Sequence, residues 1–124
     1  IQIEARVMGD LALNQIVPIA SKYEAMLLDK VYKMSQLNLD ASQDIALIKE
    51  ISTLTTDIQR MVNEMIEARK VANRIASERE KAIAYHDTVA PMLESIRHHI
   101  DQLELVVDNE LWTLPKYREL LFIV

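Results

Sequence analysis

The stretch ISTLTTDIQRMVNEMIEARKVANRIASEREKA, residues 51–82, decides the fold of this chain. Positions in it that alternate at spacings of three and four residues are apolar, with one exception. They are Ile51, Leu54, Ile58, Met61, Met65, Ala68, Ala72, Ile75, Arg79 and Ala82. This heptad spacing is typical of a helix that packs along one stripe against another helix. Because no Gly or Pro interrupts residues 42–85, and Asp40 or Ser42 can cap the start, the sequence predicts one helix of about 44 residues, roughly 65 Å long.

A second heptad seam follows, and every one of its positions is apolar. They are Val89, Leu93, Ile96, Ile100, Leu103 and Val107. The seam predicts a helix over residues 88–109 with Asp87 or Thr88 as N-cap and Pro91 in the first turn, where a missing N–H costs little. The alternative is one continuous helix kinked at Pro91. Two matching seams need to meet, which favours a break and an antiparallel hairpin.

The first segment, residues 2–36, also shows a helical apolar stripe. Its members are Ile16, Ala20, Tyr23, Leu27, Val31 and Met34. Pro18 is expected to kink or break this helix near Val17. The loop-like stretch SQLNLDASQD, residues 35–44, predicts the first turn. The tail LWTLPKYRELLFIV, residues 111–124, ends apolar and is expected to dock on another surface.

These elements predict a single all-α domain over residues 1–124. We expect an antiparallel bundle of three helices, or of four if Pro18 splits the first. The helices run up, down and up. One very long helix forms a helical hairpin with its neighbour and extends past the other helices. The composition agrees, since half of the residues are apolar, only 5% are aromatic, and there are one Gly and three Pro. The start at Ile1, inside a helical pattern, is interpreted as a sign of a fragment of a larger chain.

The charge of the chain limits its partners. The formal net charge is −5, with 19 acidic and 14 basic residues. This balance argues against nucleic acid and against an anionic membrane, because both require a positive face. The chain has no cysteine, no signal peptide, and no run approaching the roughly 18 apolar residues of a membrane span. We therefore expect a cytoplasmic protein without a disulfide framework or thiolate metal site.

The histidines do not have the spacing of a metal site. His98 and His99 are adjacent, so on a helix they point about 100° apart, and His86 lies near the expected turn. Neither Glu-x-x-His pairs nor a His-Glu-x-x-His motif occurs in the sequence. Surface or interhelical positions are the expected places for these side chains.

The charged residues between the seam positions suggest an ordinary solvated face. Glu64, Glu67, Glu78 and Glu80 lie among basic residues, and the pairs Glu67–Lys70 and Glu78–Lys81 have salt-bridge spacing. The basic residues are Arg60, Arg69, Lys70, Arg74, Arg79 and Lys81. Arg79 interrupts the seam, which could mark where a partner helix has ended, set the register through a buried ion pair, or reach out to solvent.

Methionine and glycine give no sign of a cofactor site. Met61 and Met65 lie on the long seam, and Met26 and Met34 lie on the first helix, so core filling is the expected role of all four. Gly9 is the only glycine, which leaves no Gly-rich phosphate loop and no nucleophile elbow. The sequence therefore predicts no catalytic, cofactor-binding or metal-binding residue in this chain.

Several stretches resemble type III glutamine synthetases. IQIEARVMGDLALNQIVPIASKY, residues 1–23, resembles the segment that leaves the catalytic domain of these enzymes, and residues 78–124 resemble their C-terminal end. The most distinctive part is W-x-L-P-K-Y-R-E-L-L-F at residues 112–122. EARKVANRIASEREKA, residues 67–82, fits as well, whereas residues 36–60 fit less distinctively.

The resemblance implies a parent enzyme whose chemistry lies outside this chain. The family joins ammonia to glutamate with ATP and Mg²⁺ or Mn²⁺, in large ring-shaped oligomers, at sites built from a β-grasp domain and a catalytic α/β domain. None of those motifs occurs here, so no catalytic residue is carried over. The resemblance implies a non-catalytic helical C-terminal domain with a structural, inter-subunit or regulatory role. Its partners would be the catalytic domain of the same chain and neighbouring subunits of a homo-oligomer.

A different class of function fits the heptad seams equally well. A free-standing coiled-coil or spectrin-like interaction module would carry the same pattern without an attached ligase. A helical-bundle metalloenzyme would need inward-facing Glu and His sets, and the sequence does not show them.

Overall fold

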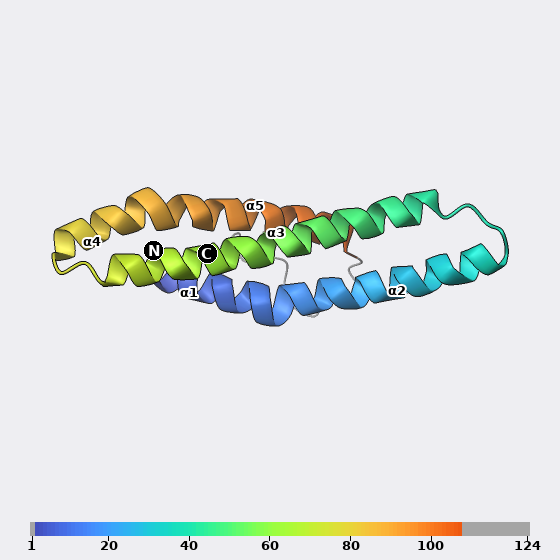
Figure 1. The fold of residues 1–124 in the computed structure, drawn as a ribbon, viewed down its shortest axis with the longest axis horizontal. Coiled ribbons are helices and arrows are strands. Elements are labelled where there is room, and N and C mark those ends of the chain that lie inside the picture. The colour runs from blue at the N-terminus through green and yellow to red at the C-terminus, as the bar shows by residue number, and fades with distance from the viewer. Residues whose placement is uncertain (1, 108–124) are drawn as a thin grey trace, which may run out of the picture.

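The computed structural model describes residues 2–107, which form three long antiparallel helical rods (Figure 1). The elements in chain order are α1 (Gln2–Leu11), η1 (Ala12–Ile16), α2 (Val17–Gln36), α3 (Ser42–Asn73), α4 (Glu78–Ala84), η2 (Tyr85–Val89) and α5 (Ala90–Val106). The rods cover residues 2–36, 42–73 and 78–106, and the described range contains no strand. The expected all-α, up-down-up bundle is confirmed. The docking tail, residues 111–124, lies outside the described residues.

The two heptad seams meet in the core, as the spacing predicted. All six positions of the second seam, from Val89 to Val107, are buried. On the long seam the buried positions are Ile51, Leu54, Ile58, Met61, Met65 and Ala72, and Ala68 is partly buried against them. The prediction fails after α3 ends, where Ile75 is only partly buried and Ala82 is exposed. Local heptad spacing was therefore enough to identify the packed face of α3 and of α5.

The second interhelical turn lies about ten residues earlier in the chain than predicted. Helix α3 ends at Asn73, and the next helix begins at Glu78, so both the predicted helix over residues 42–85 and the predicted start at residue 88 are wrong. Ser77 is the N-cap, and its hydroxyl accepts a hydrogen bond from the Glu80 N–H at 3.3 Å. Ser-x-x-Glu is the sequence of a capping box, which favours a helix start here.

Neither Pro18 nor Pro91 breaks its helix, because a π-helical turn precedes each of them. The Val17 N–H bonds to the Ala12 carbonyl and the Ala90 N–H bonds to the Tyr85 carbonyl, a reach of five residues in both cases. Proline has no N–H, and its ring clashes with the carbonyl four residues earlier in a regular helix. The wider turn makes room for the ring. The chain therefore has three rods rather than four, and although Pro91 lies in the first turn of α5, that turn continues the rod that begins at Glu78 instead of starting a new one.

The first interhelical turn lies within residues 35–44, as its composition predicted. Asn38 has φ 56°, the Leu39 N–H bonds to the Met34 carbonyl at 2.9 Å, and the Asn38 N–H bonds to the Ser35 carbonyl at 3.2 Å. These bonds form a Schellman motif, which ends α2. Asp40 then accepts a hydrogen bond from the Ser42 N–H at 3.0 Å, so it caps α3 from one residue before the N-cap.

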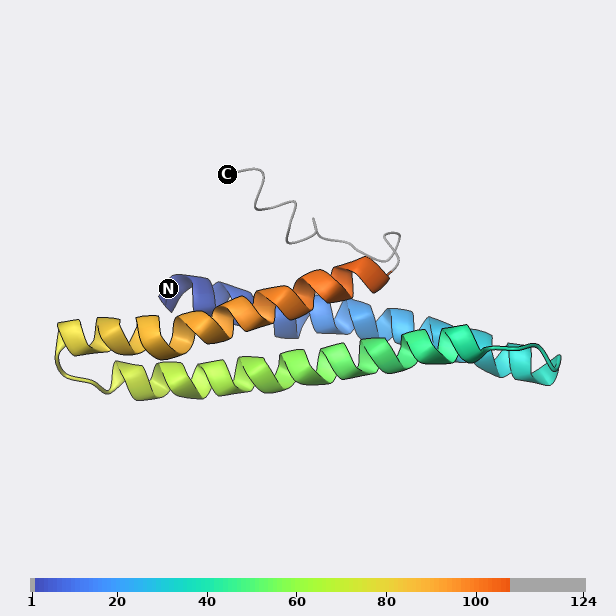
Figure 2. The same cartoon turned by 90° about the horizontal axis from the view of Figure 1, so that it is seen from above.

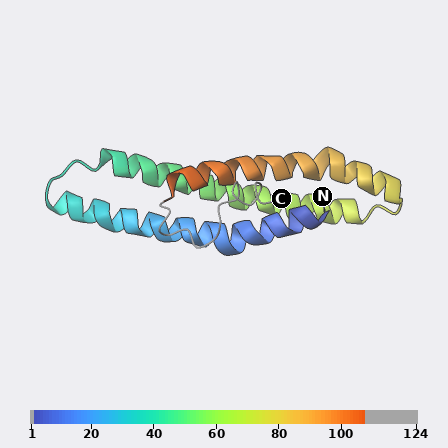
Figure 3. The ribbon, with the colours of Figure 1, turned by 180° about the vertical axis from the view of Figure 1, so that it is seen from behind.

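In the middle of the bundle all three rods pack side by side, whereas at each end only two of them do. Figure 2 shows α2 and α3 extending past the end of α5, and Figure 3 shows α3 and α4 extending past the start of α1. Along α2, Ala20 and Leu27 are buried, whereas Val31 and Met34 are only partly buried. We call the section with three helices the three-helix middle. The last two turns of α2, the turn 37–41 and the first turn of α3 form the α2–α3 end.

Candidate functional site

Arg97 joins two of the rods through a pair of carboxylates. Its guanidinium lies 2.7 Å from a carboxylate oxygen of Glu94 in the same helix and 3.2 Å from one of Glu4 in α1. The Arg97 side chain is about three-quarters buried, whereas both carboxylates are more exposed. The contact joins α1 to α5 across the surface of the bundle.

Three further polar contacts join α3 to its neighbours. The Lys30 ammonium lies 3.1 Å from Asp44, between α2 and α3. The Tyr85 hydroxyl donates a 2.6 Å hydrogen bond to Asn73 Oδ1, between η2 and the last residue of α3. The remaining contact, His99 Nε2 to Asp57 Oδ2, is longer at 3.9 Å.

The histidines occupy surface and interhelical positions, as expected. His86 and His98 are exposed, and His86 lies 3.2 Å from Asp87. His99 is partly buried and faces α3. The described residues 2–107 contain no group of three or more His, Asp or Glu side chains that could together hold a metal ion.

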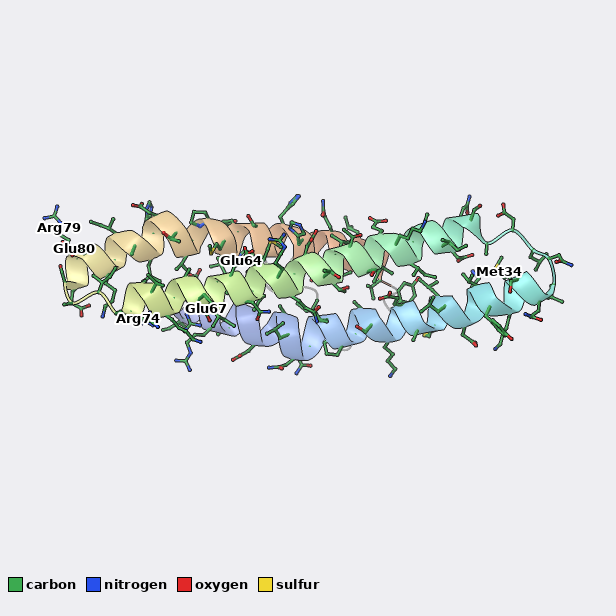
Figure 4. All side chains as sticks on the ribbon, in the orientation of Figure 1. Met34, Glu64, Glu67, Arg74, Arg79 and Glu80 are labelled. Carbon is green, nitrogen blue, oxygen red and sulfur yellow. The ribbon has the colours of Figure 1, made fainter. Side chains whose placement is uncertain are left out.

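The predicted charge pairs form on the surface. Lys70 lies 3.3 Å from Glu67, and Lys81 lies 3.5 Å from Glu78. Arg79 does not interrupt a packed seam, because α3 has already ended, and it lies exposed in the first turn of α4. Figure 4 shows Arg79 and Glu80 at the tip of the molecule, beyond Arg74. Of the three interpretations of Arg79, the exposed position excludes the buried ion pair and fits both an outward-pointing side chain and a site beyond the end of the neighbouring helices.

Core filling is confirmed for only some of the methionines. Met61 and Met65 are buried against the other rods, and Met34 is partly buried. The prediction for Met26 is wrong, because more than half of its side chain is exposed on α2. Met8, which the sequence did not single out, is buried in the core.

An apolar groove runs between α1 and α5, and the sequence analysis missed it. It has a volume of about 200 Å³ and is lined by Ile3, Glu4, Val7, Met8, Leu11 and Arg97. We call it the α1–α5 groove. Ile3 is 77% exposed and Val7 is 60% exposed, although their spacing of four residues continues to Leu11. This spacing was a usable signal, but it could not show that the face would be left uncovered.

A larger groove between α3 and α5 is more polar. Its volume is about 560 Å³, and its lining residues are Lys49, Glu50, Thr53, Leu54, Gln102, Leu105 and Val106. We call it the α3–α5 groove. No helix in the described part of the chain has the length and apolar character needed to cross a membrane.

These features define an elongated antiparallel three-helix bundle whose distinctive surfaces are the apolar α1–α5 groove, the more polar α3–α5 groove and the exposed apolar side chains of the α2–α3 end. The chain matches no protein-family model. It is similar over 98% of its length to a glutamine synthetase of Bacteroides fragilis (strain YCH46), with 51% identity. A type-3 glutamine synthetase of Dictyostelium discoideum is 24% identical over 99% of this chain, and a glutamine synthetase of Butyrivibrio fibrisolvens is 23% identical over 98%.

The resemblance to glutamine synthetases is therefore confirmed, and it extends from end to end of this chain. The chain spans only 18% of the length of each of these three relatives, so the similarity covers a small part of each.

Proposed function

We propose that this chain is a non-catalytic helical C-terminal domain of a glutamine synthetase, with a structural, inter-subunit or regulatory role. The observation that carries the proposal is the 51% identity over 98% of the chain to a glutamine synthetase that is several times longer. The ATP-dependent joining of ammonia to glutamate, and the ATP and Mg²⁺ or Mn²⁺ it requires, then belong to the parent enzyme. The proposed location is the cytoplasm, without a nucleic-acid or membrane partner.

The α2–α3 end supports a packing role. Its exposed apolar side chains include Tyr32, Leu37 and Leu39. Exposed apolar groups that gather on one part of a surface are typical of protein–protein contacts. In the proposed assembly this end packs on the catalytic domain of the same chain or on a neighbouring subunit of a homo-oligomer.

The alternative, a free-standing interaction module, would bind a partner helix through a heptad seam. Both seams already pack against each other within this one chain, since Ile58 and Ile96 have no exposed surface. A partner helix would therefore have to use a different face. Reading the parent gene upstream of Ile1 distinguishes the two functions, because an encoded ligase domain is expected only for the proposed one.

The test of the proposed contact uses a full-length glutamine synthetase that carries this segment. Replacing Leu37 and Leu39 together by Asp places two charges on the α2–α3 end, and we expect a smaller assembly by size-exclusion chromatography with light scattering. Ser21→Asp, at an exposed site elsewhere on α2, is the matched control and should leave the assembly intact. An unchanged assembly with unchanged specific activity in the double variant would contradict the packing role.

A second measurement tests the non-catalytic part of the proposal. The 124-residue chain, supplied with glutamate, ammonia, ATP and Mg²⁺, is expected to form no glutamine. Glutamine formation by this chain alone would overturn the proposal.

A further inference from the structure

The α1–α5 groove has an apolar floor and, on the α1 side, an exposed apolar wall. Met8 at the floor is buried, whereas Ile3 and Val7 are mostly exposed although neither carries a polar group. The ion pair between Arg97 and Glu4 lies at its edge. Covering the groove with apolar side chains would remove these two residues from water at a gain of about 25 cal/mol per Å².

The end of α5 determines which segment can reach this groove. The Val107 N–H makes the last helical hydrogen bond, to the Leu103 carbonyl at 3.0 Å. Val107 itself has φ −82° and ψ 136°, an extended conformation in which the helix cannot continue. The rest of the chain, residues 108–124, lies outside the described residues, and many of its side chains are apolar. These are Leu111, Trp112, Leu114, Leu120, Leu121, Phe122, Ile123 and Val124.

The distance from Val107 to the groove is short. Arg97 lies ten positions before Val107 on α5, which corresponds to about 15 Å of helix. An extended chain covers about 3.3 Å per residue, so roughly five residues bring it back to the level of Arg97. The fifth residue after Val107 is Trp112. The contact between Arg97 and Glu4 places α1 beside α5 at this level, and Figure 2 shows the two helices next to each other. A chain that turns back along α5 therefore passes the groove.

We propose that the chain's own C-terminal segment, residues 111–124, docks in the α1–α5 groove. The covalent connection favours this occupant over a second copy, because a short linker gives an effective concentration in the millimolar range. The α3–α5 groove is less suited to an apolar segment, since Lys49, Glu50 and Gln102 are among its lining residues. This inference does not depend on the proposed glutamine synthetase parent.

Trp112 makes the proposal testable, because it is the only tryptophan in the 124-residue chain. In the docked state its fluorescence emission maximum lies at a shorter wavelength than in the urea-unfolded chain. Val7→Asp places a charge in the groove and should shift the emission maximum toward that of the unfolded chain. Leu28→Asp, which introduces the same charge at a similarly exposed position on α2, should leave the emission unchanged.

Far-UV circular dichroism shows whether each variant keeps its helices, and Val7→Ser replaces Val7→Asp if the latter does not fold. A native emission maximum equal to that of the unfolded chain would overturn the proposal. An unchanged emission maximum in the folded Val7 variant would overturn it as well. Emission that shifts to the unfolded value on dilution, together with dissociation of a dimer in sedimentation, would assign the groove to a second copy and contradict docking within one chain.

Discussion

The three-helix middle and the α2–α3 end carry similar apolar stripes but bury them to different depths. In the middle, Ile51 and Ile58 have no exposed surface. At the α2–α3 end, Val31 and Met34 are only partly buried, and Ile45 is 39% exposed. The difference follows from the number of neighbouring helices, because α5 does not extend alongside this end (Figure 1). A periodic stripe thus identifies the face of a helix that packs, whereas the tertiary arrangement determines how deeply that face is buried.

The largest expected effect tests this difference directly with the same substitution in both regions. Ile58→Asp places an unpaired charge in the three-helix middle and should destabilise the chain by several kcal/mol, enough to threaten its folding. Ile45→Asp, at the partly exposed end, should cost less than about 1 kcal/mol because water can solvate the new carboxylate. Thermal unfolding followed by circular dichroism measures both variants.

Equal losses of stability in the two variants would contradict the difference in burial between the two regions, since they would require Ile45 to be covered in solution. A melting temperature that barely moves in Ile58→Asp would show that the central seam of α3 is assigned to the wrong face.

The sequence predicted the packed faces better than the ends of the helices. The seam from Val89 to Val107 is entirely buried, because heptad spacing is a local property that the chain displays directly. The turn at residues 74–77 was missed because it contains neither Gly nor Pro. Its one usable signal was the capping box from Ser77 to Glu80. Pro91 instead suggested a break, but the π-turn ahead of it keeps the helix continuous.

The candidate surfaces were less predictable than the fold. Charge pairs within one helix, such as Glu67–Lys70, follow from spacing and were predicted. The contact between Arg97 and Glu4 joins residues 93 positions apart, so it depends on which rods lie side by side. The exposure of Ile3 and Val7 also depends on the tertiary arrangement, because no further helix within residues 2–107 covers that face of α1.

The end formed by the C-terminus of α3 and by α4 offers a second test, because a partly buried polar contact joins its two helical rods. Tyr85→Phe removes the hydroxyl that donates to Asn73 but keeps the ring packed, and it should cost about 1 kcal/mol. Tyr32→Phe, at an exposed site on α2, is the control and should change stability by less than about 0.5 kcal/mol. Urea denaturation gives both values. An equal, negligible effect in the two variants would mean that the Tyr85–Asn73 bond contributes no stability to this end.

A stabilising substitution is expected in the three-helix middle. A Cβ added at Gly9 would lie 3.6 Å from Val62 Cγ1 and 3.9 Å from Met65 Cε, which are ordinary van der Waals contacts. Because Gly costs about 0.5–1 kcal/mol relative to Ala inside a helix, Gly9→Ala should raise the free energy of unfolding by roughly 0.5 kcal/mol. Ala25→Gly on exposed α2 is the reverse control and should lower it. A loss of stability in Gly9→Ala would show that α1 lies closer to α3 than these distances allow.

The smallest effect concerns the turn at the α2–α3 end and depends on pH. Hydrogen bonds from Ser42, first from its backbone N–H and then from its side chain, lower the pKa of Asp40. Because the folded pKa lies below the unfolded value of about 3.9, the stability from this carboxylate is present above that value. It is lost as the pH falls through the folded pKa.

Asp40→Asn keeps an acceptor oxygen but cannot ionise, so it separates this titration from the rest of the turn. The melting temperature of the original chain should exceed that of the variant at neutral pH by a small amount, and the difference should shrink as the pH falls below about 4. A difference that stays constant down to about pH 2.5 would show that the charge of Asp40 does not hold the turn. The α2–α3 end would then depend only on the Schellman motif at Asn38 and on the contact between Lys30 and Asp44.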